Sequence, residues 1–196
     1  GTGKTAVAAV ALAAAADSST QAAVMAPTSV LAQQYAQKIG PLLSLAGITW
    51  ALITGSTSEE ERQQIELCLA DGSLSVVFGT TALLSDSVVF KQLTLAVVDE
   101  QHRFGVQQRD ALRESRNDGL LVHQLVMTAT PIPRSVAMTI FGDLDVTVMK
   151  GLPSGRKPVA TFVVDAGNAV WMERMWQRAR EEIDGGGRVY VVCPRI

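Results

Sequence analysis

The chain has 196 residues, a mass of 20.9 kDa and a formal net charge of −2, and 47% of its residues are hydrophobic. This composition supports a buried core and excludes a chain that is disordered throughout. The longest uncharged apolar run, residues 6–16, is shorter than the roughly 18–20 residues of a membrane-spanning helix, so we expect a soluble protein without a membrane partner.

Short apolar segments alternate with helical segments, which predicts an α/β fold with a parallel sheet. Helices are expected at 4–16, 29–39, 58–70, 106–116 and 134–141, and strands at 21–26, 48–53, 75–78, 93–98, 121–127 and 145–149. Ser58 and Glu61 have the spacing of a capping box at the start of the third helix. Pro41 is expected to end or kink the second helix.

A domain boundary is expected where Gly, Pro and Ser concentrate, in the segment KGLPSGRKP of residues 150–158. The charge changes sign there: residues 1–149 carry nine basic and fourteen acidic residues, and residues 150–196 carry eight and five. We therefore expect a domain at 1–150, a linker at 151–158 and the start of a second domain at 159–196.

The part after the linker is predicted to form a strand (159–164), a helix (169–183) and a strand (188–193). Two strands and a helix cannot enclose a core alone, so this second domain is expected to be truncated. The helix carries apolar residues at helical spacing that predict core packing rather than a surface on which bases stack. They are Trp171, Met172, Met175 and Trp176.

The first residues, Gly1-Thr2-Gly3-Lys4-Thr5, match the end of the phosphate-loop pattern GxxxxGK[ST] and lead into an Ala-rich helix. Glycines let backbone N–H groups approach phosphate oxygens, and the helix N-terminus adds partial positive charge. In this interpretation Lys4 contacts the β- and γ-phosphates and the Thr5 hydroxyl binds Mg²⁺. The first glycine of the pattern would precede residue 1, so we expect a truncated N-terminus. The alternative is an exposed glycine turn that caps a helix.

Two acids, Asp99 and Glu100, directly follow the apolar segment 95–98. Burying adjacent carboxylates is costly unless a cation or hydrogen bonds compensate, so this pattern favours a metal or proton-transfer site. In a phosphate-loop ATPase, Asp99 would hold the Mg²⁺ hydration shell and Glu100 would polarise the attacking water. The alternative is a strand end with solvated acids.

Longer strings carry a family resemblance. Asp99-Glu100-Gln101-His102 has the DExH form of helicase motif II, and Thr128-Ala129-Thr130 has the form of motif III. With DEQHRFGVQQR, MTATPIPR, FGDLDV and LPSGRKPV, the chain closely resembles the RecG family of ATP-dependent branched-DNA helicases along its whole length. The transcription-repair coupling factor shares HRFGV and TATPIPR, but normally has Glu in place of Gln101 and lacks the LPxGRxPV linker.

The resemblance implies a superfamily 2 motor with two RecA-like domains and ATP between them. Motif I would comprise Gly1, Gly3, Lys4 and Thr5, and motif II would comprise Asp99, Glu100 and His102. Two further segments resemble motifs that face nucleic acid: Ala26-Pro27-Thr28, as motif Ia, and Gly79-Thr80-Thr81, as the GT motif. Short hydroxyls and loop amides can hold a phosphate backbone without a large basic surface, which suits a chain of charge −2. Helix-capping or turn roles are the alternative for Thr28 and Thr80.

The motif III threonines, Thr128 and Thr130, are expected to hydrogen-bond toward His102 and to pass the nucleotide state to the DNA side. Arg134 is a candidate coupling residue, with a solvated position at a helix start as the alternative. His123 is assigned a structural role.

The sequence therefore predicts part of an enzyme that hydrolyses ATP with Mg²⁺ and remodels branched double-stranded DNA, namely stalled forks and Holliday junctions, in repair and recombination. The family implies a wedge domain and arginine fingers that these residues do not contain, so we expect little activity from this part alone. We expect a cytoplasmic location, and a monomer is favoured although the oligomeric state stays open. The alternatives are a transcription-repair coupling factor, a nucleotide-binding scaffold without catalysis, and a small phosphate-loop kinase.

Overall fold

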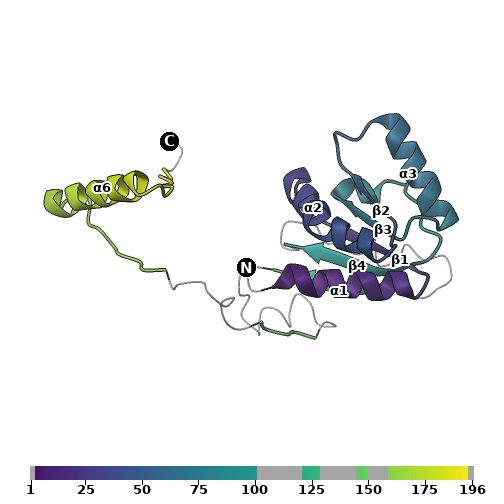
Figure 1. Ribbon diagram of the computed structural model, residues 1–196. Coiled ribbons are helices and arrows are strands. Elements are labelled where there is room, and N and C mark those ends of the chain that lie inside the picture. Colours follow the sequence, from purple (N-terminus) through teal and green to yellow (C-terminus); the bar gives the residue numbers. More distant parts are fainter. Residues whose placement is uncertain (1–2, 101–120, 129–144, 150–158, 194–196) are drawn as a thin grey trace. The chain divides into compact units, whose positions relative to one another are not determined.

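A computed structural model describes residues 3–100, 121–128, 145–149 and 159–193 of the chain (Figure 1). The chain divides into two units, Gly1–Pro153 and Ser154–Ile196. The first unit holds a sheet with helices on both faces, and the described part of the second holds one helix. No helix in the described residues is long and apolar enough to cross a membrane.

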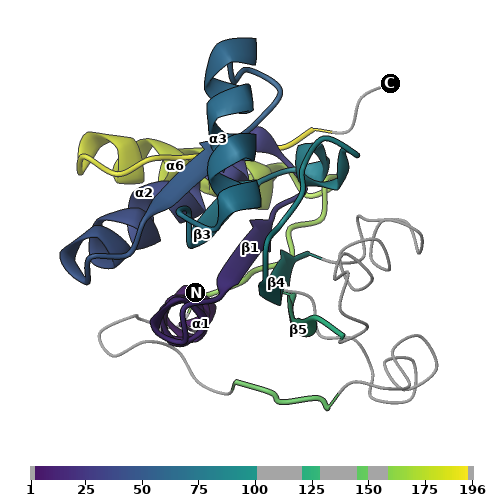
Figure 2. The same ribbon diagram turned by 90° about the vertical axis from the view of Figure 1, so that its right-hand side faces the viewer.

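The sheet of the first unit has five strands in the order β2-β3-β1-β4-β5, and every neighbouring pair is parallel. Figure 2 shows β4 between β1 and β5. This confirms the predicted α/β class with a parallel sheet. The elements, in chain order, are α1 (Lys4–Asp17), β1 (Gln21–Met25), α2 (Ser29–Leu45), β2 (Trp50–Ile53), α3 (Glu59–Asp71), β3 (Val76–Gly79), the 3-10 helix η1 (Thr81–Leu84), β4 (Leu93–Asp99) and β5 (His123–Met127). The predicted helices 106–116 and 134–141 lie outside the described residues.

The two faces of the sheet pack against different helices, because successive strand residues point to opposite sides. In β4, Leu95 and Val97 join the core under α1 and α2, whereas Ala96 and Val98 join the core under α3 and η1. Burial on both faces explains why the strands are apolar throughout rather than alternating.

The expectation that the second helix ends at residue 39 is wrong, because α2 continues through Pro41 to Leu45. Proline removes one helical hydrogen bond, but Leu43, beyond it, is only 2% exposed and packs in the same core as Ile39. This tertiary packing stabilises the last turn of the helix. At α3 the predicted N-cap is confirmed, since the Ser58 hydroxyl accepts a hydrogen bond from the Glu61 amide at 3.3 Å.

The strands predicted at 145–149, 159–164 and 188–193 are not strands in the structure. These segments are almost entirely exposed and make no strand ladder with the described residues. A short strand pair is unstable unless its apolar face is covered, so an apolar sequence alone does not produce strands here.

The second unit forms the predicted helix as α6 (Ala169–Asp184), capped by the Asn168 side chain on the Trp171 amide at 3.2 Å. The expectation that Trp171, Met172, Met175 and Trp176 form a core is wrong for the described residues, because α6 buries none of its side chains there. A helix contributes to a core only where another layer covers its apolar stripe.

Gln21, at the start of β1, joins three distant segments of the first unit. It is 3% exposed; its Nε2 donates to the carbonyls of Leu69 (2.8 Å) and Leu74 (2.9 Å), and its Oε1 accepts from the Gln92 amide (2.9 Å). The side chain thus ties the start of β1 to the end of α3, to the segment before β3 and to the segment before β4.

Replacing Gln21 by alanine is expected to lower the free energy of unfolding by about 2–3 kcal/mol, because three buried backbone groups each lose a hydrogen bond and only the Leu69 carbonyl keeps another, from the Lys91 amide. Urea unfolding followed by circular dichroism measures this loss. The matched control is Gln63→Ala, which removes one exposed hydrogen bond to Glu59 and should change stability by less than about 0.5 kcal/mol. Equal effects of the two substitutions would contradict the proposed role of Gln21.

Candidate functional site

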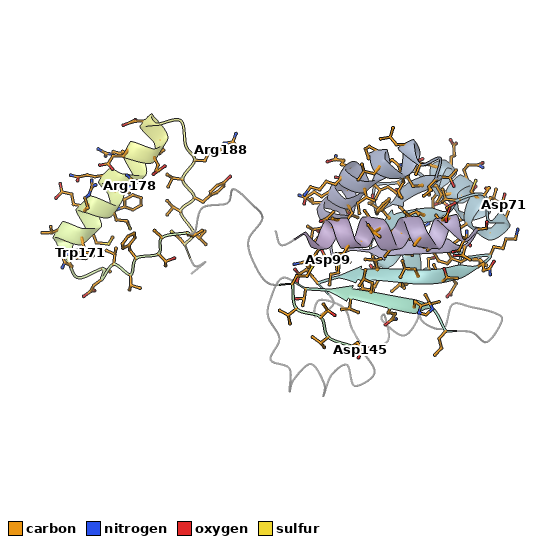
Figure 3. The ribbon with its side chains drawn as sticks, turned by 60° about the horizontal axis from the view of Figure 1, so that its bottom comes forward. Asp71, Asp99, Asp145, Trp171, Arg178 and Arg188 are labelled. Atoms are coloured by element: carbon orange, nitrogen blue, oxygen red, sulfur yellow. The ribbon has the colours of Figure 1, made fainter. Side chains whose placement is uncertain are left out.

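The ends of four parallel strands bring the candidate residues to one edge of the sheet. Because β1, β3, β4 and β5 run in the same direction, the segments that follow them meet at their carboxyl edge, where ligands bind in open α/β sheets. Helix α1 returns directly into β1 through residues 18–20, so its N-terminus also lies at this edge. Figure 3 shows Asp99 at this end of β4, beside the first turn of α1.

Helix α1 begins directly after Gly3, which has a φ of 96° in the left-handed region. Glycine adopts this conformation without the strain that a side chain would cause, so the chain can turn sharply into the helix. Lys4 and Thr5 are the first residues of the helix and are half-buried. Gly1 and Thr2 lie outside the described residues.

Asp99 is the last residue of β4 and is 7% exposed. Its Oδ1 is buried and has no hydrogen-bond partner among the described residues. Burial raises the pKa of the Asp99 carboxyl; a hydrogen bond from Tyr35 opposes this increase, the Glu100 charge adds to it, and the Lys4 charge opposes it. Lys4 and Asp99, 95 positions apart in the sequence, are therefore close enough to interact electrostatically.

Glu100 has a φ of 51°, which is unusual for a residue with a side chain. Its backbone N–H donates to the Met127 carbonyl at 2.8 Å, and its carboxylate Oε2 accepts from the Thr128 hydroxyl at 3.4 Å. Strained backbone of this kind occurs frequently at functional sites. The structure thus places Thr128 against Glu100, while its expected partner His102 lies outside the described residues.

The threonines of the two candidate DNA motifs cap short helical segments. The Thr28 hydroxyl accepts from the Leu31 amide at 3.3 Å, and the Thr80 hydroxyl accepts from the Ala82 amide at 3.4 Å. These bonds agree with the alternative interpretation, in which Thr28 and Thr80 cap helices. Both residues nevertheless lie at the carboxyl edge of the sheet. Packing alone explains why residue 79 is a glycine, since a Cβ at this position would lie 2.8 Å from the Ile53 carbonyl oxygen.

The structure thus gathers part of the predicted site. Gly3, Lys4 and Thr5 at the start of α1 share the carboxyl edge with two groups from the strand ends, the Asp99–Glu100 pair and Thr128, while Pro27 is half-buried after β1. Three further candidates lie outside the described residues: His102, Thr130 and Arg134.

Sequence reasoning missed Tyr35 of α2, which is 8% exposed and packs in the same core cluster as Met127, the strand partner of Asp99. Burial raises the pKa of Tyr35, and the charge of Asp99 raises it further. The available signal was weak: Tyr35 belongs to an apolar helical stripe, and a buried tyrosine hydroxyl generally requires a hydrogen-bond partner.

The donor set at this edge fits a divalent cation. A buried carboxylate oxygen without a partner is costly, and a hard cation such as Mg²⁺ prefers carboxylate, hydroxyl and phosphate oxygens. Asp99 and the Thr5 hydroxyl supply such oxygens at this edge, while Lys4 and the start of α1 supply positive charge for an anion.

Comparisons with known proteins agree on one family. Residues 1–139 match the family model described as DEAD/DEAH box helicase. The whole chain is 45% identical to ATP-dependent DNA helicase RecG of Mycobacterium bovis and 43% identical to that of Bacillus subtilis, and covers 28% of each. The solved structure of RecG bound to a three-way DNA junction superposes with a TM-score of 0.80 at 40% identity, over 95% of this chain and 24% of that one.

The chain therefore belongs to the DEAD/DEAH box helicase family, whose members bind nucleotide. Within this family it is similar to RecG along its whole length, which confirms the resemblance drawn from the motifs and favours RecG over the transcription-repair coupling factor. The chain spans about a quarter of the length of these relatives. A solved structure of Saccharomyces cerevisiae Dbp5, 22% identical with a TM-score of 0.52 over 74% of this chain, shares the fold.

Proposed function

We propose that the chain is part of a RecG-type ATP-dependent DNA helicase. Residues 1–150 would be its first RecA-like motor domain, 151–158 the linker and 159–196 the start of the second motor domain. ATP hydrolysis would drive translocation on double-stranded DNA and remodel stalled forks and Holliday junctions in repair and recombination. The observation that carries the proposal is the buried, unpartnered Oδ1 of Asp99 beside Glu100 and within electrostatic range of Lys4.

The start of α1 would hold the triphosphate. Gly1, Thr2 and Gly3 would offer backbone N–H groups to phosphate oxygens, and the N-terminal end of the helix dipole would favour their negative charge. The Lys4 ammonium would pair with the β- and γ-phosphates. Its position near Asp99 supports this role, because the same cation can contact phosphate beside the metal ligands.

Asp99 and Thr5 would hold Mg²⁺ through their oxygens, and the bound ion would neutralise the charge that develops on the phosphates. Glu100 would accept a proton from the attacking water as its oxygen forms a bond to the γ-phosphorus, and the bond to the ADP oxygen breaks in line. The contact between Thr128 and Glu100 supports a link between motif III and this base.

The other side of the carboxyl edge would face DNA. Pro27 and Thr28 after β1, and Gly79 and Thr80 after β3, would contact the phosphate backbone mainly through loop amides, because both hydroxyls already cap helices. Thr128, Thr130 and Arg134, with His102, would couple nucleotide state to these contacts. A RecG relative is known in complex with a three-way DNA junction, which supports branched DNA as the partner.

Replacing Asp99 by asparagine in the full-length helicase tests the metal site. We expect the thermal midpoint in metal-free buffer to rise by roughly 2–4 °C, because a neutral amide replaces a buried carboxylate with an unpartnered oxygen. We also expect the extra stabilisation that Mg²⁺ adds to ADP binding to be lost, and ATP turnover to fall at least about 100-fold. Differential scanning calorimetry and steady-state ATPase assays measure these effects.

The matched control is Asp86→Asn, at an exposed position outside the site, which should behave as wild type in all three measurements. If Asp99→Asn keeps both the Mg²⁺-dependent stabilisation and the turnover, Asp99 does not hold the metal and the proposed site is wrong.

A further inference from the structure

Two pairs of polar side chains four residues apart lie on helix α3, and they differ in burial. Gln63 donates to the Glu59 carboxylate at 3.2 Å, and both residues are exposed. Arg62 Nε donates to Glu66 Oε1 at 2.9 Å, and these two side chains are only 23% and 15% exposed. Exposed pairs contribute little, because solvent competes for both groups. The Arg62–Glu66 pair instead lies against neighbouring parts of the chain.

Both members of the Arg62–Glu66 pair also bond to the segment that follows β3. Arg62 Nη2 donates to the Ala82 carbonyl of η1 at 3.2 Å. Glu66 Oε1, which accepts from Arg62, also accepts from the Ser87 hydroxyl at 2.8 Å. A guanidinium presents its donors in a fixed fork, so it can hold the carboxylate and the carbonyl at the same time. The pair consequently joins the segment 82–87 to α3 at both of its ends.

The 3-10 helix η1 is a single turn, and two of the bonds at its ends are long. The Ala82 amide lies 3.4 Å from the Thr80 hydroxyl that caps it, and the Ser85 amide lies 3.4 Å from the Ala82 carbonyl. Hydrogen bonds in 3-10 helices have poorer geometry than those in α-helices, so a short one depends on its neighbours. The bond from Arg62 to the Ala82 carbonyl therefore helps to fix η1.

The position of η1 decides where the candidate DNA segment lies. Leu83 of η1 is 2% exposed and packs in the same core cluster as Ile65 and Leu69 of α3. It also lies directly against Gly79, since a Cβ at that residue would lie 2.7 Å from the Leu83 Cγ. Thr80 follows Gly79 and caps η1. A shift of η1 against α3 would therefore also move Gly79 and Thr80, the two residues proposed to contact the phosphate backbone.

We propose that Arg62 and Glu66 are positioning residues for DNA binding: they hold η1 on α3 and thereby keep Gly79 and Thr80 in the arrangement that contacts the phosphate backbone. This inference rests on the proposed DNA-facing role of that segment. Backbone amides bind a phosphate only while they point toward it, and a segment that leaves this arrangement for part of the time binds more weakly in proportion. The pair thereby sets DNA affinity rather than the rate of ATP hydrolysis.

The test is Arg62→Met in the full-length helicase, because methionine keeps an unbranched side chain on the helix and removes both hydrogen bonds. We expect the Kd for a forked DNA duplex, measured by fluorescence anisotropy, to rise about three- to fivefold, because the fraction of the segment that is competent to bind falls. The DNA concentration for half-maximal ATPase activity should rise by the same factor, with kcat at saturating DNA within about twofold of wild type. The matched control is Gln63→Ala, which removes the exposed bond to Glu59 on the same helix and should leave all three values at wild type.

Substitutions of Glu66 separate its hydrogen bonds from its charge. Glu66→Gln keeps an oxygen that can accept from Arg62 and Ser87, so its DNA affinity should stay within about twofold of wild type. Glu66→Ala loses both bonds and should resemble Arg62→Met. Stronger DNA binding in Glu66→Ala would indicate that Arg62 contacts DNA through its charge, and would overturn the inference. Wild-type DNA affinity in Arg62→Met, or an equal loss in Gln63→Ala, would overturn it too.

Amide hydrogen exchange followed by mass spectrometry distinguishes a failure of this inference from a failure of the proposed function. Forked DNA should slow exchange in the wild-type peptide that contains residues 79–85; without that protection, the proposed DNA-facing role of Gly79 and Thr80 is wrong. In Arg62→Met without DNA, exchange in this peptide should become at least about threefold faster, because the segment opens more often. If DNA protects the wild-type peptide while Arg62→Met neither speeds its exchange nor weakens DNA binding, only the positioning role of Arg62 and Glu66 is wrong.

Discussion

Replacing Glu100 by glutamine in the full-length helicase is expected to lower kcat for ATP hydrolysis by about 10²- to 10⁴-fold, the range attributed to general base catalysis. Glutamine has nearly the same shape and can still accept a hydrogen bond from Thr128, but it cannot take a proton from water. ADP affinity should stay within about twofold of wild type, because the proposed phosphate contacts come from the start of α1.

The backbone around Glu100 makes this substitution a clean test. Its left-handed φ and its N–H bond to the Met127 carbonyl belong to the main chain and do not require an acid. The control is Glu60→Gln, at an exposed position in the first turn of α3, which should leave kcat unchanged. Steady-state and single-turnover assays measure the loss. Turnover above about a tenth of wild type would show that Glu100 is not the base.

Replacing Lys4 by alanine is expected to abolish turnover by a different route. Each charge-assisted hydrogen bond to phosphate contributes about 1.5–3 kcal/mol, so the affinity for ATP should fall roughly 10- to 150-fold. The substitution also removes the positive charge that lowers the pKa of Asp99, so the metal site loses part of its electrostatic support. Fluorescent-nucleotide binding and ATPase assays measure the two effects.

The control for Lys4→Ala is Lys38→Ala, at an exposed position of α2, which should bind nucleotide as wild type does. Together with Glu100→Gln, the substitution separates binding from chemistry: loss of Lys4 should impair both, and loss of the Glu100 acid should impair chemistry alone. If Lys4→Ala binds ATP normally, the opening glycine-lysine segment is not a phosphate loop in this protein.

Local signals in the sequence predicted much of the first unit. The apolar segments before Asp99 and Thr128 became β4 and β5, Ser58 capped α3 as expected, and α1 began at Lys4. These features depend on a few neighbouring residues: a hydroxyl three positions before an amide, a glycine before a helix, or an apolar run long enough for one strand. The parallel sheet followed from their alternation.

Contacts between distant segments were not predictable in the same way. The end of α2 depends on the packing of Leu43 in the core. The expected strands of the second unit would need partner strands and a layer that covers their apolar face. Gln21 looked like the first residue of an ordinary strand, yet it holds three segments together. In each case the deciding group is far away along the chain.

The chemical groups of the candidate site could be read from the residues alone: a lysine after a glycine turn, two acids at a strand end and a threonine after the next strand. Packing between distant segments set three further features: Lys4 interacts electrostatically with Asp99, Thr128 bonds to Glu100, and Tyr35 packs in the core cluster of Met127 beside Asp99. The physical reason is that capping and strand formation act over a few residues, whereas the environment of a buried carboxylate is set by whichever elements the sheet order brings beside it.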